Sequence, residues 1–284
     1  MRLHACQGPD GQTKISFLWL QMQKETSMSD TGSATVQTIC RYPVKGLSPE
    51  FLETVACKSG ETLPYDRVYA IENGPSRFDP QNPKHLPKTS FLMLMRDERL
   101  ATLETRFDAV SQTLTVLRGG KQVATGRLDE PTGRRIIEQF YSAYMNFSLR
   151  GAPKLVSAVG HSFSDMPAKC VHIINLETIR DLERSTGKSI DPLRFRANIY
   201  VDGMEPWSEF GWIDRSLSIG DAGFTVFART KRCDATNVNP RKGVRDMNLP
   251  TLLQRNWGHS DFGIYAKVSS DGQIRTGDSI TVEA

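Results

Sequence analysis

Hydrophobic and polar residues alternate in short stretches from residue 36 onward, and this period of two predicts β-strands. In the first half of the chain we expect strands at residues 36–44, 67–71, 114–117 and 122–128. Gly119 and Gly120 separate the last two strands, as in a two-residue hairpin, because glycine tolerates positive φ. The pattern therefore predicts a small β-rich or β-barrel module over residues 36–130.

The period changes to that of a helix in two places. Between residues 132 and 147, apolar residues recur three or four positions apart, and we expect a connecting helix within residues 131–150. A second helix is predicted at residues 176–186, where Asn175 can cap the first turn and Gly187 can end the last one.

Strand signals return in the C-terminal half, at residues 196–202, 224–230, 263–268 and 279–283. Strands and helices do not alternate regularly, which favours a β-barrel over a doubly wound sheet. The predicted fold class is mainly β with α (α+β), with the β-rich module followed, over residues 151–284, by a β-barrel with peripheral helices. Residues 1–35 are expected to be a flexible N-terminal extension, in which Met28 could be the true start.

Composition narrows the class of protein. The chain has 284 residues, of which 38% are hydrophobic and 24% charged, and no apolar run approaches the roughly 20 residues that span a bilayer. The odd number of cysteines and the absence of a C-x-x-C pair argue against a disulfide framework. We therefore expect a soluble cytoplasmic protein in a reducing compartment. The five cysteines are Cys6, Cys40, Cys57, Cys170 and Cys233.

Positive charge is concentrated in one segment of the chain. Lys and Arg outnumber Asp and Glu by only 36 to 32, which is too little to indicate nucleic acid. Residues 229–245, however, contain six cations and one acidic residue, Asp234. Such a segment is either an anion site or a solvated loop. An RNA-binding β-barrel is disfavoured, because the segment has no aromatic residue on which a base could stack.

Cys233 is the best candidate for chemistry. The sequence contains no phosphate-binding loop, no H-E-x-x-H motif and no G-x-S-x-G motif. Cys233 lies where the strand at 224–230 gives way to a turn-rich loop, and three cations lie within four residues of it. Positive charge favours the thiolate, which attacks electrophiles or ligates soft metals. The alternative is a small buried apolar residue, and we take Cys40, Cys57 and Cys170 as structural in that sense.

Several motifs, in order along the chain, resemble a known domain. The sequences R-F-R-A-N-I-Y-V-D-G at 194–203, T-K-R-C-D-A-T at 230–236 and I-R-T-G-D at 274–278 resemble the MOSC domain, named for the C-terminal part of molybdenum cofactor sulfurases. Upstream, R-Y-P-V-K-G at 41–46 and D-R-V-Y-A-I at 66–71 resemble the β-barrel module that precedes MOSC in the amidoxime-reducing family. The resemblance implies that residues 151–284 are a MOSC domain.

This resemblance also implies a set of site residues. Cys233 is expected to ligate the molybdenum of a pterin cofactor (Mo-molybdopterin), and Lys45, Arg67 and Arg196 are expected to hold that cofactor. A pterin phosphate is a small dianion, which Arg binds through a planar fork and Lys as a point charge. Further candidates for cofactor binding are Asn198, Asn175, Asp234 and Thr236.

Other roles for these cations stay open at the level of sequence. Lys45 and Arg67 could be solvated charges at strand ends, and Arg196 could form an ion pair with Asp202 or Asp191.

The function implied by the resemblance is that of a molybdenum-dependent oxidoreductase, which reduces small N-hydroxylated or N-oxide molecules by oxygen removal at a cysteine-ligated metal. The chain has no haem signature and no C-terminal four-cysteine iron–sulfur segment, so a separate ferredoxin-like protein, cytochrome or flavoprotein is expected to supply electrons. The alternative is a non-catalytic carrier of the cofactor, or of sulfur as a Cys233 persulfide, for another molybdoenzyme. Two departures from the family, Gly46 after the motif lysine and Lys231 two residues before the cysteine, leave the substrate open.

Overall fold

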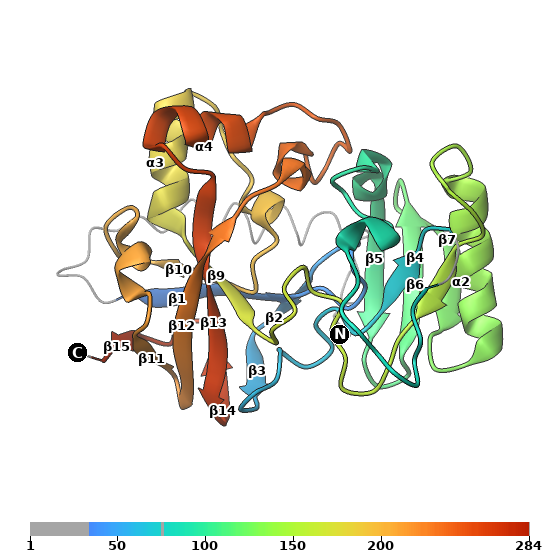
Figure 1. The fold of residues 1–284 in the computed structure, drawn as a ribbon, viewed down its shortest axis with the longest axis horizontal. Helices are drawn as coiled ribbons and strands as arrows, with labels where there is room; N and C mark the ends of the chain where they lie inside the picture. Colours follow the sequence, from blue (N-terminus) through green and yellow to red (C-terminus); the bar gives the residue numbers. More distant parts are fainter. Residues whose placement is uncertain (1–33, 75–76, 284) are drawn as a thin grey trace, which may run out of the picture.

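A computed structural model describes residues 34–74 and 77–283, and its main feature is a curled sheet that forms half of a barrel (Figure 1). Eight strands lie in the order β15-β11-β12-β13-β9-β10-β1-β2. The β9–β10 pair is parallel, and the other pairs are antiparallel. The strands are β1 (Thr35–Arg41), β2 (Glu50–Leu52), β9 (Val171–Asn175), β10 (Ile199–Asp202), β11 (Ser216–Ile219), β12 (Ala222–Lys231), β13 (Asp261–Ser270) and β15 (Ile280–Val282).

Side chains from one face of this sheet form the largest hydrophobic core. Along β12, Ala222, Phe224 and Val226 are buried while the residues between them are partly exposed, as expected for a strand with one inward face. Two helices, α3 (Leu176–Thr186) and α4 (Leu249–Trp257), lie together at one end of the sheet over a second core (Figure 1). The Asn175 side chain caps α3 and Gly187 ends it at φ +63°, so the predicted helix is confirmed with its predicted ends.

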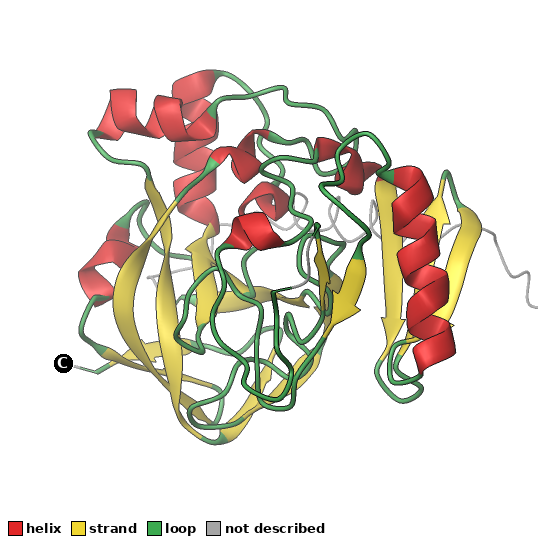
Figure 2. Ribbon diagram, turned by 45° about the vertical axis from the view of Figure 1, so that its right-hand side comes forward, coloured by secondary structure: helices red, strands yellow, loops and turns green. Residues whose placement is uncertain are grey.

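The opposite end of the molecule is a smaller layer of sheet and helix. Strands β5 (Leu103–Asp108), β6 (Thr113–Arg118) and β7 (Lys121–Arg127) form an antiparallel sheet, against which α2 (Pro131–Tyr144) packs (Figure 2). Gly119 and Gly120 adopt positive φ in the β6–β7 turn, as the hairpin prediction requires. Strands β4 (Ala70–Glu72) and β8 (Lys154–Val156) form a separate pair beside this layer.

The strands of the N-terminal part are shared between the two ends of the molecule. Strands β1 and β2 belong to the eight-stranded sheet, and β3 (Thr54–Cys57) pairs with β14 (Gly272–Arg275). The α+β class with mostly strands is confirmed, whereas the division of the chain at residues 130 and 150 stays a prediction. The proposed extension at residues 1–35 and the start at Met28 fall almost wholly outside the described residues. Short 3₁₀ helices complete the fold: η1 (Lys88–Ser90), η2 (Glu98–Thr102), η3 (Pro192–Phe195), η4 (Ser208–Trp212) and η5 (Asp234–Asn237).

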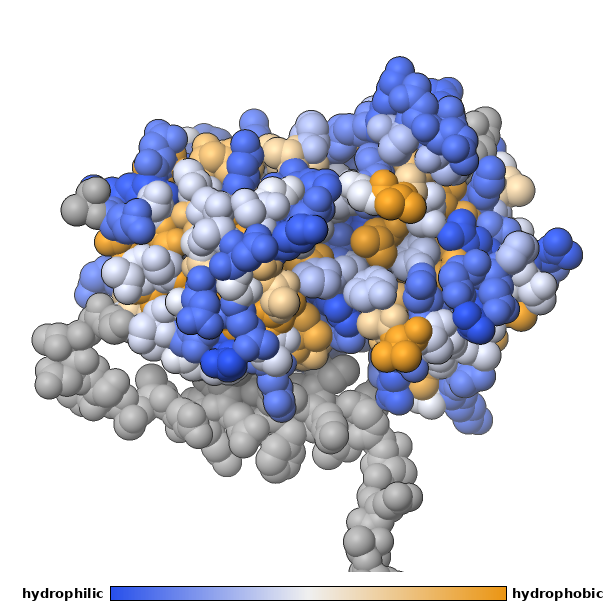
Figure 3. All heavy atoms as spheres, turned by 90° about the horizontal axis from the view of Figure 1, so that it is seen from below, coloured by the Kyte–Doolittle hydropathy of each residue, from blue (hydrophilic) through white to orange (hydrophobic). Residues whose placement is uncertain are grey.

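In the described part of the chain, no helix has the length and apolar character needed to cross a membrane. On the face shown in Figure 3, hydrophobic residues reach the surface as separate patches between hydrophilic ones. Exposed large hydrophobic residues such as Val110, Phe147 and Val159 come from different turns and loops.

Candidate functional site

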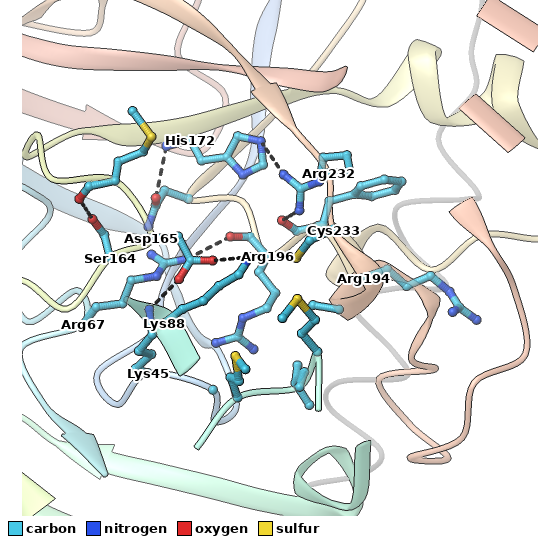
Figure 4. Close-up of a pocket in the computed structure, with 18 of the residues that line it drawn as sticks. Lys45, Arg67, Lys88, Ser164, Asp165, His172, Arg194, Arg196, Arg232 and Cys233 are labelled. Carbon is cyan, nitrogen blue, oxygen red and sulfur yellow. Dashed lines mark hydrogen bonds and ion pairs between the residues drawn. The ribbon is translucent and has the colours of Figure 1, made fainter. Parts of the chain in front are cut away.

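A strongly basic cavity lies between the half-barrel sheet and loops of the N-terminal part (Figure 4). Its wall includes the Cys233 side chain and a single carboxylate among the described lining residues, that of Asp165. Because the cations far outnumber this carboxylate, the cavity suits an anionic ligand. The cations that line it are Lys45, Arg67, Lys88, Arg194, Arg196 and Arg232.

Cys233 stands at the end of β12, where the strand gives way to η5. Its backbone is extended and its carbonyl oxygen accepts hydrogen bonds from the amide and the hydroxyl of Thr236, at 3.0 and 2.9 Å. The residue is only partly buried and faces the cavity, whereas Cys40, Cys57 and Cys170 are buried. Its thiol is therefore not sealed in apolar packing.

Arg194 holds the loop that carries Cys233. One terminal nitrogen of its guanidinium donates to the carbonyls of Thr236 and Asn237, at 3.4 and 3.3 Å. The other donates to the Asp246 carboxylate at 2.6 Å. Since Arg194 itself is buried, these contacts fix η5 relative to η3 and hence the direction of the Cys233 side chain.

Two of the cavity arginines stack on a single tyrosine. The centroid of the Tyr42 ring lies 4.7 Å from the Arg67 guanidinium carbon and 4.1 Å from that of Arg196. The ring is therefore in cation–π contact with both guanidinium groups. Both arginines have φ in the left-handed region, +55° and +53°, which costs roughly 1–3 kcal/mol each and is concentrated at functional sites. Arg67 is held by Asp66 and donates to the Arg196 carbonyl at 3.0 Å, and Arg196 donates to the Leu47 carbonyl at 2.8 Å.

Lys45 and Asp165 form a partly buried ion pair in the same wall. The Lys45 ammonium donates to an Asp165 carboxylate oxygen at 2.5 Å and to the Phe163 carbonyl at 2.7 Å. Burial lowers the pKa of Lys45 despite this carboxylate. For Asp165, burial opposes ionisation, but Lys45, Lys88 and Arg67 together hold the pKa of its carboxyl well below the ordinary value. The loop around residue 165 therefore presents a fixed negative charge among the cations.

Arg232 and His172 form the wall beside Cys233. Burial, with Arg232 and Arg67 nearby, lowers the pKa of His172 well below its usual value, so its ring is neutral. A terminal nitrogen of Arg232 lies 3.4 Å from Nε2 of that ring, and the other donates to the Phe195 carbonyl at 2.7 Å. Burial also lowers the pKa of Arg232, and that of Arg196, below their usual value.

Three guanidinium groups of the cavity have a buried donor that is not used. Nε of Arg194, one terminal nitrogen of Arg196 and Nε of Arg232 have no hydrogen-bond partner among the described residues. An unsatisfied buried donor on a charged group costs more than about 1–3 kcal/mol, and such groups in native proteins usually have an acceptor. Such unused donors favour an anionic or polar ligand in the cavity.

Comparison with known proteins identifies the part of the chain that carries most of this cavity. Residues 160–281 match the model of the MOSC domain. These residues form a MOSC domain. They contain Asp165, His172, Arg196, Arg232 and Cys233 of the cavity wall, whereas its other cations include Lys45, Arg67 and Lys88 from the preceding part of the chain.

Several known proteins are similar to part of this chain. A molybdenum cofactor sulfurase from Drosophila mojavensis is 33% identical over 122 residues, which cover 39% of this chain and 15% of the sulfurase. Mitochondrial amidoxime reducing component 2 from Rattus norvegicus is 29% identical over 122 residues, which cover 39% of this chain and 36% of that protein. The chain thus spans a minor part of the length of the relatives it matches.

Among solved structures, the YUAD protein from Bacillus subtilis aligns with 88% of this chain and 95% of its own, at 12% identity and a TM-score of 0.42. YiiM from Geobacillus stearothermophilus aligns with 40% of this chain and 54% of its own, at 18% identity and a TM-score of 0.33.

The structure brings together five of the residues predicted to form the site. Lys45, Arg67, Arg196, Asn198 and Cys233 all line the cavity, although they come from both parts of the chain. The Asn198 side chain, however, already forms hydrogen bonds with the backbone. Its oxygen accepts from the amide of residue 172 at 3.1 Å, and its nitrogen donates to the carbonyl of residue 40 at 3.1 Å. Asn198 therefore ties β9 to β1 beneath the cavity.

Three other predicted residues do not line the cavity. Asn175 caps α3 and donates to the buried Glu209 carboxylate at 3.1 Å. Thr236 faces back to the Cys233 carbonyl, and Asp234 is exposed. Each of the three has a local role in capping, a turn or the surface, which the same residue types commonly serve.

The alternative ion pairs considered for Arg196 do not form. Asp202 binds Arg180 at 2.7 Å, and Asp191 binds Arg241 at 2.8 Å. Lys45 and the Arg67 side chain are largely buried, at 6% and 14% exposure, so neither is a solvated charge at a strand end. All three cations instead face the cavity.

Sequence reasoning missed several residues of the wall. Arg194 and Arg232 belong to the motifs that carry the resemblance, and so a signal for them was present. Lys88 and Asp165 come from loops with no recognisable period, where a lysine or an aspartate is normally solvated. His172 lies in β9, a strand that is buried over its whole length and was not predicted.

Proposed function

We propose that this chain binds a molybdenum cofactor in the basic cavity and reduces small N-hydroxylated or N-oxide compounds. The observation that carries the proposal is the partly exposed thiol of Cys233 in a cavity wall with six cations. Part of this wall belongs to the MOSC domain, and part comes from the residues that precede it. The names of the similar proteins, molybdenum cofactor sulfurase and amidoxime reducing component, agree with a cofactor of this kind and with this class of substrate.

The residues present fit such a cofactor. A molybdenum ion is bound by soft sulfur ligands, and Cys233 offers one at the cavity surface. The cofactor also carries a phosphate dianion, for which the cavity has the buried Lys45 and the partly buried Arg67 and Arg196. The unused donors of Arg196 and Arg232 supply hydrogen bonds that no described protein group accepts.

Each group of residues has a distinct part in the proposal. Cys233 would be the protein's sulfur ligand, held in direction by Arg194 through η5. Lys45, Arg67 and Arg196 would bind the anionic phosphate, with the Tyr42 ring in contact with both guanidiniums. When bound, the cofactor supplies the two-electron oxygen-atom transfer, while the protein fixes its orientation and charge. A ferredoxin-like protein, a cytochrome or a flavoprotein would deliver the electrons.

Turnover of benzamidoxime by purified protein with an artificial electron donor tests this function. We expect formation of benzamidine in proportion to the molybdenum content of the preparation, because reduction needs the loaded site. Protein freed of molybdenum is the control and should form none. A preparation with about one molybdenum per chain that reduces neither benzamidoxime nor an N-oxide would contradict the reductase and favour a carrier of the cofactor or of sulfur.

A further inference from the structure

One part of the cavity wall is apolar and consists largely of methionine. Met93, Leu94 and Met95 follow one another in the segment between η1 and η2, and Met166 comes from the MOSC domain; all four line the cavity. Met93 and Leu94 are buried, and Met95 is partly exposed. Residues 93–95 are called the methionine turn below. Thioether and leucine side chains cannot pair with a phosphate, so the proposed cofactor site leaves the methionine turn without a role.

Arg245 fastens the methionine turn beside the residue that follows Cys233. One terminal nitrogen of the Arg245 guanidinium donates to the Met95 carbonyl at 2.8 Å, and the other donates to the Asp234 carbonyl at 3.2 Å. The two nitrogens belong to one rigid planar fork, so the two carbonyls that accept from it lie close together. The methionine turn therefore adjoins the start of η5, next to the thiol.

Gly46 lets the methionine turn approach the cavity from its other side. Its φ is +82°, and a Cβ at this position would lie 2.8 Å from the Leu92 carbonyl oxygen and 3.5 Å from the Met93 Cα. Gly46 directly follows Lys45 of the cavity wall. The methionine turn is thus held between the segment that carries Lys45 and the loop that carries Cys233.

The chemistry of this part of the wall suits an uncharged apolar group. Methionine is unbranched and polarisable, adapts to ligands of different shapes and makes favourable contacts with aromatic rings. A charged group packed against thioethers would lose hydration without gaining a partner from them. A substrate whose N–O group reaches a metal on Cys233 would place the rest of its structure within reach of Met95, which is tied to the neighbouring residue.

We propose that Met93 and Met95 form a substrate subsite that binds the hydrocarbon part of the N-hydroxylated compound and selects uncharged compounds with an aromatic or other apolar group. This inference rests on the proposed function. It predicts that benzamidoxime is a better substrate than acetamidoxime, which has the same reacting group but a methyl in place of the ring. A single methylene in a hydrophobic pocket commonly changes kcat/KM by 10-fold or more, so we expect a preference of at least about 10-fold.

The test compares variants of the full chain loaded with molybdenum. Met95→Gln makes the side chain polar at similar size, Met95→Leu keeps it apolar, and Met204→Gln changes a partly buried methionine outside the cavity. Reduced benzyl viologen supplies the two electrons that, with two protons, convert an amidoxime to an amidine and water. The values of kcat/KM for both amidoximes are measured, together with the Kd of benzamidoxime for oxidised protein without an electron donor, in which no turnover takes place.

We expect Met95→Gln to lower the preference for benzamidoxime over acetamidoxime by about 2- to 10-fold, and to raise the Kd of benzamidoxime by a similar factor. Met95→Leu and Met204→Gln should keep the preference of the unmodified chain. A Met95→Gln protein with the unmodified preference and Kd overturns the subsite. Should Met95→Gln not hold molybdenum, Met95→Ala decides by the same two measurements, and loss of molybdenum by both overturns the assignment to substrate.

The unmodified chain separates failure of this inference from failure of the proposed function. Molybdenum-loaded protein that reduces both amidoximes with equal kcat/KM overturns the apolar subsite alone. Molybdenum-loaded protein that reduces neither overturns the proposed function, and this inference with it.

Discussion

Protein carrying Cys233→Ala is expected to retain little molybdenum. In the proposed site the thiolate is the only protein atom bonded to the metal, while the phosphate contacts hold the cofactor from its other end. Loss of even an outer partner of a metal ligand commonly weakens binding by about 10- to 100-fold, and loss of the ligand itself should cost at least as much. The measurement is molybdenum per chain by elemental analysis after gel filtration, with benzamidoxime reduction followed in parallel.

Cys170→Ala is the matched control for this experiment. Cys170 also lines the cavity, but it is buried, and burial raises the pKa of its thiol to about 12, so it is not poised to ligate a metal. We expect this variant to keep its molybdenum. Equal molybdenum in the unmodified chain and in Cys233→Ala would refute the ligand assignment, and depletion in Cys170→Ala alone would transfer it to Cys170.

Replacement of Arg196 by glutamine is expected to have the second-largest effect. The change removes a partly buried guanidinium that donates to the Leu47 carbonyl, stacks on Tyr42 and keeps one donor free for a ligand. Hydrogen bonds to charged groups contribute about 1.5–3 kcal/mol, which corresponds to roughly 10- to 150-fold weaker retention of the cofactor. Molybdenum and pterin released during dialysis should both increase, since this contact holds the phosphate and not the metal.

Arg180→Gln provides the comparison for Arg196. Arg180 is also partly buried and forms ion pairs with Glu177 and Asp202, but it lies on α3 away from the cavity. Its loss should leave molybdenum and pterin unchanged. If Arg196→Gln retains both as firmly as Arg180→Gln does, Arg196 does not hold the cofactor.

The parts of the fold that sequence predicted well are those in which local chemistry decides the structure. Helix α3 begins after Asn175, whose side chain caps an amide of the first turn. It ends at Gly187, because glycine adopts positive φ easily. The pair of glycines at 119–120 predicted the hairpin correctly for the same reason, since both adopt positive φ. Strand β9 was missed because all five of its residues are buried, so it shows no alternation. The pairing of β1 with β10 and of β3 with β14 joins residues more than 150 apart, which no local pattern reveals.

The same distinction holds for the site. Cys233 stood out because cations adjoin it in the sequence, whereas Lys45, Arg67 and Arg196 were reached only through the resemblance. Lys88 and Asp165 were missed, because only the fold brings an ordinary loop lysine and aspartate into the same cavity wall as a cysteine more than 65 residues away. Asn175 was given a cofactor role that the geometry does not support by any contact with the cavity.

The central claim is a bond between the Cys233 sulfur and molybdenum, and X-ray absorption at the molybdenum edge tests it most directly. The unmodified chain and Cys233→Ser, each reconstituted with excess cofactor, are compared for the number of sulfur atoms around the metal. We predict one sulfur neighbour fewer in Cys233→Ser, with the sulfurs of the cofactor retained. The same number of sulfur neighbours in both proteins would show that Cys233 does not bind the metal.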